Sequence, residues 1–320
     1  MDHFEDFKDT ETLVERPNRF QALLHLILGF LFFIGSLFIL GSLAVIICSY
    51  LISGTTIDLS AMMDLLNDLK SHPFVLKLFI FISSSLPMIV ASLLTLIFIK
   101  ATAKDYLLLN FPKSMKWFLL SMVFVFISIP LMGVMLEVNK LIDFSQWPDF
   151  HKWLITQENT NNGIYEAMVG DKGAMSFLSS ILFMALVPAL VEEIFFRGFL
   201  MNAFNGLFKN MHIAIFITAI IFSLIHMQFM KIIPMFFLAI VFGYAAYWTG
   251  TIWTSIIAHF INNTLAVIQL YYLTDGSYEE ALEQSSKIAP ALNIVFGIGV
   301  IVLFYYLQRN STTKTQNFYV

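Results

Sequence analysis

Residues 20–53 read FQALLHLILGFLFFIGSLFILGSLAVIICSYLIS, with no Asp, Glu, Lys or Arg. A helix needs about 20 apolar residues to cross the hydrocarbon of a bilayer. This run exceeds that length, so it can span the membrane and also tilt or project beyond it. It predicts a transmembrane helix close to the N-terminus.

The composition of the whole chain supports the same interpretation. Hydrophobic residues make up 58% of the 320 positions and charged residues only 12%, against about 25% charged in an average soluble protein. A water-soluble fold cannot bury so much apolar surface, whereas a bilayer is itself apolar. The sequence therefore predicts an all-α, polytopic transmembrane helical bundle with membrane lipids as partners.

Further apolar runs extend the bundle. Ile213–Leu273 is long enough for three helices, which brings the predicted total to about eight spans. The other runs are Phe74–Ile99, Trp117–Val138, Ser176–Phe208 and Ile288–Leu307.

The polar segments divide the chain into regions. Residues 1–19 are acidic, unlike the start of a cleaved signal peptide, and the distribution of Lys and Arg places both termini on the cytoplasmic side. In a bacterium the membrane would be the inner one. Aromatic residues mixed with charges suit either an interfacial segment or an ordinary loop over 139–173. The predicted regions are a cytoplasmic tail (1–19), N-terminal transmembrane helices (20–138), an extracytoplasmic or interfacial loop (139–173), a transmembrane core (174–274), and a last helix with the C-terminal tail (275–320).

Two classes of feature are absent from the sequence. The net charge is −4 and no basic patch with interleaved aromatics occurs, so no nucleic-acid partner is expected. Cys48 is the only cysteine, so the chain has no intrachain disulfide.

Three charged residues interrupt the span that contains 191–198, which reads VEEIFFRG. Glu193 and Arg197 are four residues apart and can form an ion pair on one helix face. Glu192 points about 100° away from Glu193 and has no partner on its own helix. A carboxyl group in that setting is suited to exchanging protons near neutral pH. Pro188, one turn earlier, is expected to kink the helix.

Two histidines lie deep in later apolar stretches. His226 follows an apolar run, and His259 is four residues before Asn263, so these two project the same way. A single histidine in a membrane helix often serves only as a hydrogen bond between helices. Together with Glu192, however, these residues could line a water-containing cavity, activate a water and stabilise an oxyanion.

Other hydrolase patterns are missing. The chain has no His-Glu-x-x-His zinc-peptidase helix, no Gly-x-Ser-Gly-like nucleophile turn and no Gly-x-Gly-Asp aspartyl signature. Zinc-peptidase, serine-peptidase and aspartyl-peptidase sites of these kinds are therefore disfavoured.

Three motifs in order resemble those of the CAAX-protease and bacteriocin-processing (CPBP) family, which includes the type II CAAX prenyl endopeptidase. They lie within about 100 residues, Ser176–Leu273. The motifs are Glu192-Glu193-x-x-x-Arg197, Phe222-x-x-x-His226 and His259-x-x-x-Asn263.

The resemblance implies that 174–274 is the catalytic core of an intramembrane endopeptidase acting on a membrane-associated or lipid-modified substrate. Glu192 with His226 would activate the attacking water, and His259 with Asn263 would stabilise the oxyanion. Glu193 and Arg197 would support the helix. The resemblance leaves two alternatives for the cofactor: the site uses none, or it uses a zinc ion held by Glu192, His226 and His259.

Two other functions remain as alternatives. One is a non-catalytic membrane scaffold or bacteriocin-immunity protein, and the other is a proton-coupled transporter that uses the same residues as a relay.

The catalytic interpretation makes a demand on the fold. Glu192 and His226 both lie toward the C-terminal part of antiparallel spans, which would put them at depths differing by about 10 Å or more. The two side chains can meet only if the helix of Glu192 continues past Arg197 toward Phe208.

Overall fold

The computed structural model describes residues 17–54, 65, 68–170, 173–273 and 290–311. Every regular element in this part of the chain is helical, which confirms the predicted all-α class. The predicted cytoplasmic tail lies outside the described residues except for 17–19. Residues 274–289 and 312–320, which hold parts of the predicted C-terminal region, also lie outside them.

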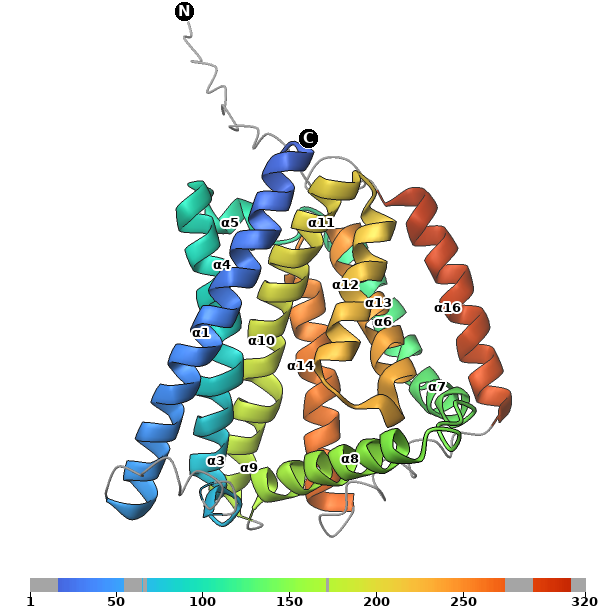
Figure 1. Ribbon diagram of the computed structural model, residues 1–320. Helices are drawn as coiled ribbons and strands as arrows, with labels where there is room; N and C mark the ends of the chain where they lie inside the picture. The colour runs from blue at the N-terminus through green and yellow to red at the C-terminus, as the bar shows by residue number, and fades with distance from the viewer. Residues whose placement is uncertain (1–16, 55–64, 66–67, 171–172, 274–289, 312–320) are drawn as a thin grey trace, which may run out of the picture.

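Two long helices form one side of the bundle (Figure 1). The first, α1 (Arg19–Ser53), begins with a capping box in which the side chains of Asn18 and Gln21 each accept a hydrogen bond from the other residue's backbone N–H. The second returns alongside it as α3 (Pro73–Ile80), a π-helical turn η2 (Phe81–Ser85) and α4 (Leu86–Ile99). A short helix, α5 (Ala103–Tyr106), follows.

A single helix of 35 residues, from Ala174 to Phe208, runs through the middle of the bundle. Pro188 lacks the N–H that would continue the α-helical hydrogen bonding. A π-helical turn ends at Leu186, two residues before the proline, and the helix continues beyond it. The consecutive parts are α9 (Ala174–Ser180), η3 (Ile181–Leu186), α10 (Val187–Glu193), η4 (Ile194–Leu200) and α11 (Met201–Phe208).

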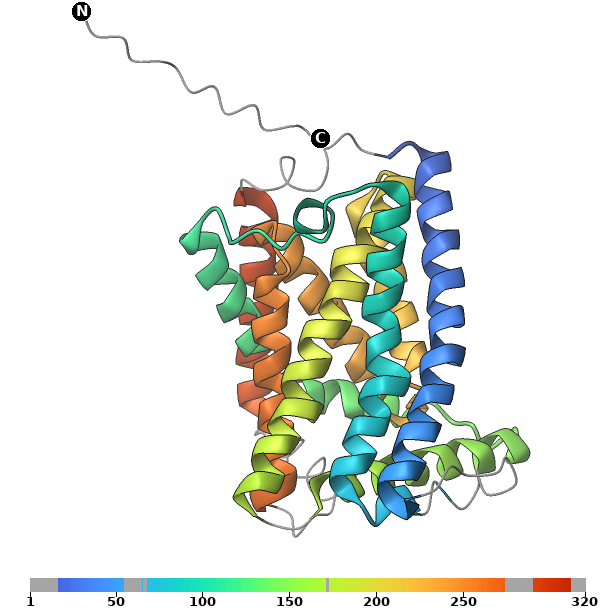
Figure 2. The ribbon, with the colours of Figure 1, turned by 90° about the vertical axis from the view of Figure 1, so that its left-hand side faces the viewer.

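The remaining helices complete the other side of the bundle. They are α6 (Met115–Ser128), α7 (Leu131–Asn139), α12 (Met211–Ile225), a 3-10 turn η5 (Phe229–Lys231), α13 (Ile232–Thr249), α14 (Trp253–Ile268) with a π-helical end η6 (Gln269–Leu273), and α16 (Pro290–Asn310). Figure 2 shows the same bundle from the side, with the first and last helices reaching the same end.

The predicted count of about eight spans is not confirmed. Among the described residues, five helices are long and apolar enough to cross a membrane, or six if α6 and α7 form one span bent by 46°. Pro130 caps α7 at that bend and accounts for the break. The apolar helix α12 has only 15 residues, about 22 Å at 1.5 Å per residue, which is shorter than the hydrocarbon layer.

A helix, α8 (Pro148–Val169), lies across the end of the bundle opposite the first residues of α1 and runs crosswise to the long helices (Figure 1). It occupies most of the polar region predicted over 139–173. Trp147, Phe150 and Trp153 near its start are exposed. The region is thus a helix that crosses the bundle end and presents aromatic side chains outward.

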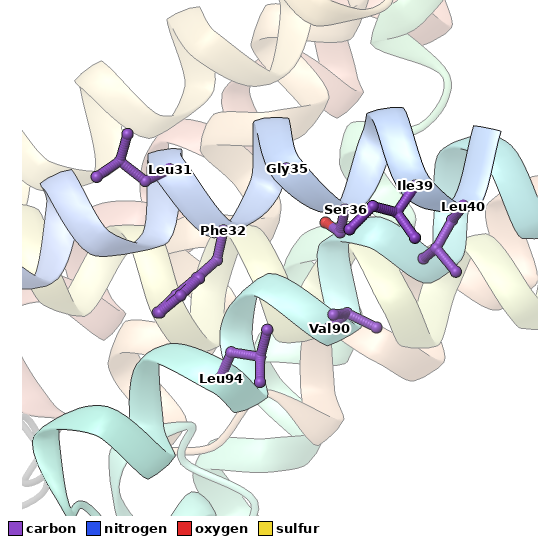
Figure 3. Close-up of a pocket in the computed structure, with 8 residues that line it drawn as sticks. All are labelled: Leu31, Phe32, Gly35, Ser36, Ile39, Leu40, Val90 and Leu94. Carbon is purple, nitrogen blue, oxygen red and sulfur yellow. The ribbon is translucent and has the colours of Figure 1, made fainter. Parts of the chain in front are cut away.

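A shallow apolar groove of about 220 Å³ lies between α1 and α4 (Figure 3). Phe32 and Gly35 of α1 and Val90 and Leu94 of α4 contribute to its walls. Its one hydroxyl, that of Ser36, already donates to backbone carbonyls. The groove contains none of the site residues predicted from the sequence.

Trp248 of α13 belongs to the largest apolar cluster among the described residues. Its side chain is fully buried against Phe124 and Phe304, and its indole N–H donates to Gln308 of α16 at 3.0 Å. This residue therefore joins three helices through packing and one polar contact.

Replacing Trp248 with Ala should destabilise the protein by about 3–5 kcal/mol, because it creates a cavity and leaves Gln308 without its donor. The measurement is the apparent melting temperature in detergent. Trp147→Ala is the matched control, since that side chain is 60% exposed. Equal melting temperatures for the two variants would contradict the assigned role of Trp248.

Candidate active site

Three helices supply the candidate residues. Glu192 lies on α10, His226 caps the C-terminal end of α12, and His259 lies on α14. Glu192 is 18 residues from Ala174 and 16 from Phe208, so it lies about 25 Å from either end of its helix. The helix therefore continues past Arg197 to Phe208, as the catalytic interpretation requires if Glu192 and His226 are to lie at the same depth.

The side chains converge on one carboxylate oxygen. Glu192 Oε2 is 3.8 Å from His226 Nε2 and 4.0 Å from His259 Nε2. These separations exceed a direct hydrogen bond. The Glu192 side chain keeps 17% of its surface exposed and that of His226 keeps 24%. The three groups are therefore close to one another, and Glu192 and His226 remain partly accessible.

Both imidazole rings are oriented by their Nδ1 atoms. His226 Nδ1 is 2.7 Å from the carbonyl oxygen of Phe222, and His259 Nδ1 is 2.9 Å from Glu193 Oε1. A carbonyl and a carboxylate can only accept, so each Nδ1 carries the proton and donates it. In the neutral rings the Nε2 lone pairs then face Glu192.

Glu193 is fully buried and binds two partners through the same oxygen. Arg197 Nη1 is 2.7 Å from Glu193 Oε1, which also accepts from His259. The other end of the guanidinium donates to the carbonyl of Ala239 at 2.9 Å and lies over the rings of Phe222 and Phe242. The ion pair on α10 and η4 thus extends to α13 and α14.

The contact between Glu193 and His259 was not predicted from the sequence. The i, i+4 spacing identifies Arg197 as a partner of Glu193 but gives no indication of a residue 66 positions away. One signal was present. Two adjacent glutamates point about 100° apart on a helix, so they must face different neighbours.

Asn263 lies one turn beyond His259 on α14. Its Oδ1 accepts a hydrogen bond from Asn262 at 3.2 Å. Within the described part of the chain, it makes no hydrogen bond to Glu192, His226 or His259. The structure therefore brings three of the four predicted catalytic residues together and places the fourth one helical turn away.

A zinc ion does not fit this arrangement as it stands. Two imidazole nitrogens and a carboxylate oxygen are suitable donors, but tetrahedral ligands at zinc distances lie about 3.4 Å apart. The separations around Glu192 Oε2 are wider than this. Among the described residues, no three His, Cys, Asp or Glu side chains form a group that could hold a metal ion.

Replacing Glu193 with Ala should destabilise the fold by about 3–5 kcal/mol, because it leaves a buried guanidinium without a counter-charge. The apparent melting temperature in detergent reports this loss. Glu137→Ala is the matched control, since it removes an ion pair to Lys140 whose side chains are both more than half exposed. A loss no larger than that of the control would show that the buried pair does not support the fold.

Comparisons with known proteins agree with the motifs. Residues 174–265 match the type II CAAX prenyl endopeptidase Rce1-like family. The chain is 32% identical over 114 residues to the membrane-embedded CAAX protease MroQ of Staphylococcus aureus (strain USA300). That alignment covers 34% of this chain and 45% of the relative's length. No solved structure matches the chain.

The match covers all three motifs and the three side chains that meet around Glu192. It also confirms the resemblance noted in the sequence, in a part of the chain that the structure shows as packed helices. Over residues 174–265 the chain is therefore similar to Rce1-like intramembrane proteases of the CPBP family.

Proposed function

We propose that the protein is an intramembrane endopeptidase that hydrolyses a peptide bond in a membrane-associated or lipid-modified substrate. The observation that carries the proposal is the convergence of His226 Nε2 and His259 Nε2 on Glu192 Oε2. The family match and the membrane-embedded protease relative support the same reaction class.

In the proposed mechanism Glu192 and His226 share the attacking water. A separation of 3.8 Å allows one water oxygen to lie about 2.8 Å from both acceptors. The water donates one hydrogen bond to each acceptor, and its oxygen lone pair points toward the substrate carbonyl. Glu192 takes a proton as the C–O bond forms and then delivers it to the leaving amine as the C–N bond breaks.

His259 and Asn263 are the proposed oxyanion donors. His259 Nδ1 already donates to Glu193, so His259 can donate through Nε2 only as the imidazolium. The carboxylate of Glu193 stabilises that positive charge and keeps the ring oriented, as the aspartate of a catalytic triad does for its histidine. Asn263 reaches the oxyanion only if its amide turns away from Asn262.

The substrate proposal follows from the depth of the site. Glu192 lies near the middle of a 35-residue apolar helix, so a water-soluble peptide would have to leave water to reach it. A lipid anchor or a membrane segment delivers the scissile bond to that depth without this desolvation cost.

Replacing Glu192 with Gln or His226 with Ala should each lower kcat by about 100- to 10,000-fold, the usual contribution of a positioned acid–base group. The assay uses purified protein and quenched fluorescent peptides with and without a lipid anchor. His72→Ala, an exposed histidine, is the matched control. Turnover that persists in Glu192→Gln would exclude this residue as the base and would favour a non-catalytic or transport role.

Chelator treatment should leave the cleavage rate unchanged, because the three donors are too widely spaced for zinc. The measurement compares rates in 1,10-phenanthroline, in its non-chelating isomer and after zinc addition. A loss that only zinc restores would instead show that Glu192, His226 and His259 close around a metal ion.

A further inference from the structure

The inner face of α8 is polar and contacts the segment that follows His226. Glu158, Asn162 and Tyr165 are four and then three residues apart, so they share one face of the helix. Glu158 forms an ion pair with Lys231, whose ammonium also donates to Asn162 Oδ1 at 3.4 Å. The phenol oxygen of Tyr165 accepts from Gln228 Nε2 at 3.0 Å.

The segment 226–231 therefore depends on α8 for its position. It begins at His226, where α12 ends, and turns sharply at Met227, a non-glycine residue with φ of 52°. The ring of Phe229 packs against Phe150 and Trp153 of α8. Gln228 lies two residues after His226 and is 6% exposed, so most of its side chain is held inside the protein.

Tyr165 lies within the electrostatic reach of the site. Burial raises the pKa of Tyr165, the hydrogen bond from Gln228 lowers it, and the negative charges of Glu192 and Glu158 raise it further. The net pKa is above its ordinary value, so the phenol stays neutral and keeps its proton at physiological pH. The ring is packed in a small apolar cluster with Val169 and Leu270, which holds the hydroxyl in place.

Gln228 has an unused acceptor. Its Nε2 donates to Tyr165, whereas no described residue donates to its Oε1. The oxygen is not sealed inside the protein, so water can satisfy it in the free protein and a ligand N–H can take the place of that water. The backbone N–H of a peptide is the donor that every protease substrate offers, and extended peptides are commonly held by such main-chain bonds.

We infer that Gln228 is a substrate-binding residue whose Oε1 accepts a hydrogen bond from a main-chain N–H of the extended peptide at Glu192. Tyr165 is a positioning residue that orients the Gln228 amide. This inference rests on the proposed peptidase function and deepens it, because it makes α8, a helix outside the family match, part of the substrate-binding wall.

The test measures KM and kcat for the wild type, Gln228→Met and Tyr165→Phe on a cleaved lipopeptide. Methionine keeps the length of glutamine but has no amide. We expect Gln228→Met to raise KM by about 3- to 10-fold with kcat nearly unchanged, the usual size of one hydrogen bond. Tyr165→Phe should raise KM less. Tyr305→Phe, a phenol exposed on α16, is the matched control.

A second measurement separates binding from a structural role. Each backbone N–H around the scissile bond is replaced in turn by N-methyl. With one of these N-methyl substrates the wild type should show a raised KM. Gln228→Met should show the same KM for that substrate as for the unmethylated one, because the two changes remove the same hydrogen bond.

The outcomes distinguish the two proposals. No cleavage by the wild type would overturn the peptidase function and this inference with it. Cleavage with an unchanged KM in Gln228→Met, or with N-methyl effects that simply add in every position, would overturn the role of Gln228 and leave the peptidase standing.

Discussion

The buried ion pair between Glu193 and Arg197 is the constraint on which the rest of the site depends. Neither side chain has more than 1% of its surface exposed. A single buried charge in an apolar bundle costs several kcal/mol, so the two residues must stay together. The guanidinium is also bound to the carbonyl of Ala239, and the carboxylate to His259. The pair thereby fixes α10, α13 and α14 relative to one another.

This arrangement gives the two neighbouring glutamates different tasks. Glu193 has its charge compensated and orients an imidazole. Glu192, one residue earlier, faces the two Nε2 atoms without a direct hydrogen bond to either. The rings cannot turn freely, because each Nδ1 is committed to a strong acceptor. A site built in this way needs little reorganisation when charge develops on a water or a carbonyl oxygen.

The family match ends at residue 265, within α14, but helices outside the matched range also contact the surroundings of the site. The helix α8 lies outside residues 174–265 and nevertheless contacts the segment directly after His226 through one ion pair, two polar contacts and aromatic packing. The three motifs and the polar residues that contact the segment after His226 thus come from different parts of the sequence.

Several features follow from the sequence alone because they depend on composition or on neighbours within one helix turn. The apolar runs determine a membrane bundle, and four-residue spacing pairs Glu193 with Arg197. The number of spans could not be read in this way. One apolar stretch becomes a 15-residue helix, and another bends at Pro130, so run length alone does not give the number of helices that cross.

The tertiary structure alone decided which of the polar residues meet. Glu193 and His259 are 66 residues apart, and Tyr165 and Gln228 are 63 apart. No local periodicity encodes such contacts, because they depend on helix rotation and on the depth at which each helix ends. A rotation of α14 by one residue, about 100°, would turn His259 away from both glutamates. The sequence by itself thus determined the membrane, the helices and the candidate residues, and helix packing placed two imidazole nitrogens beside one carboxylate oxygen.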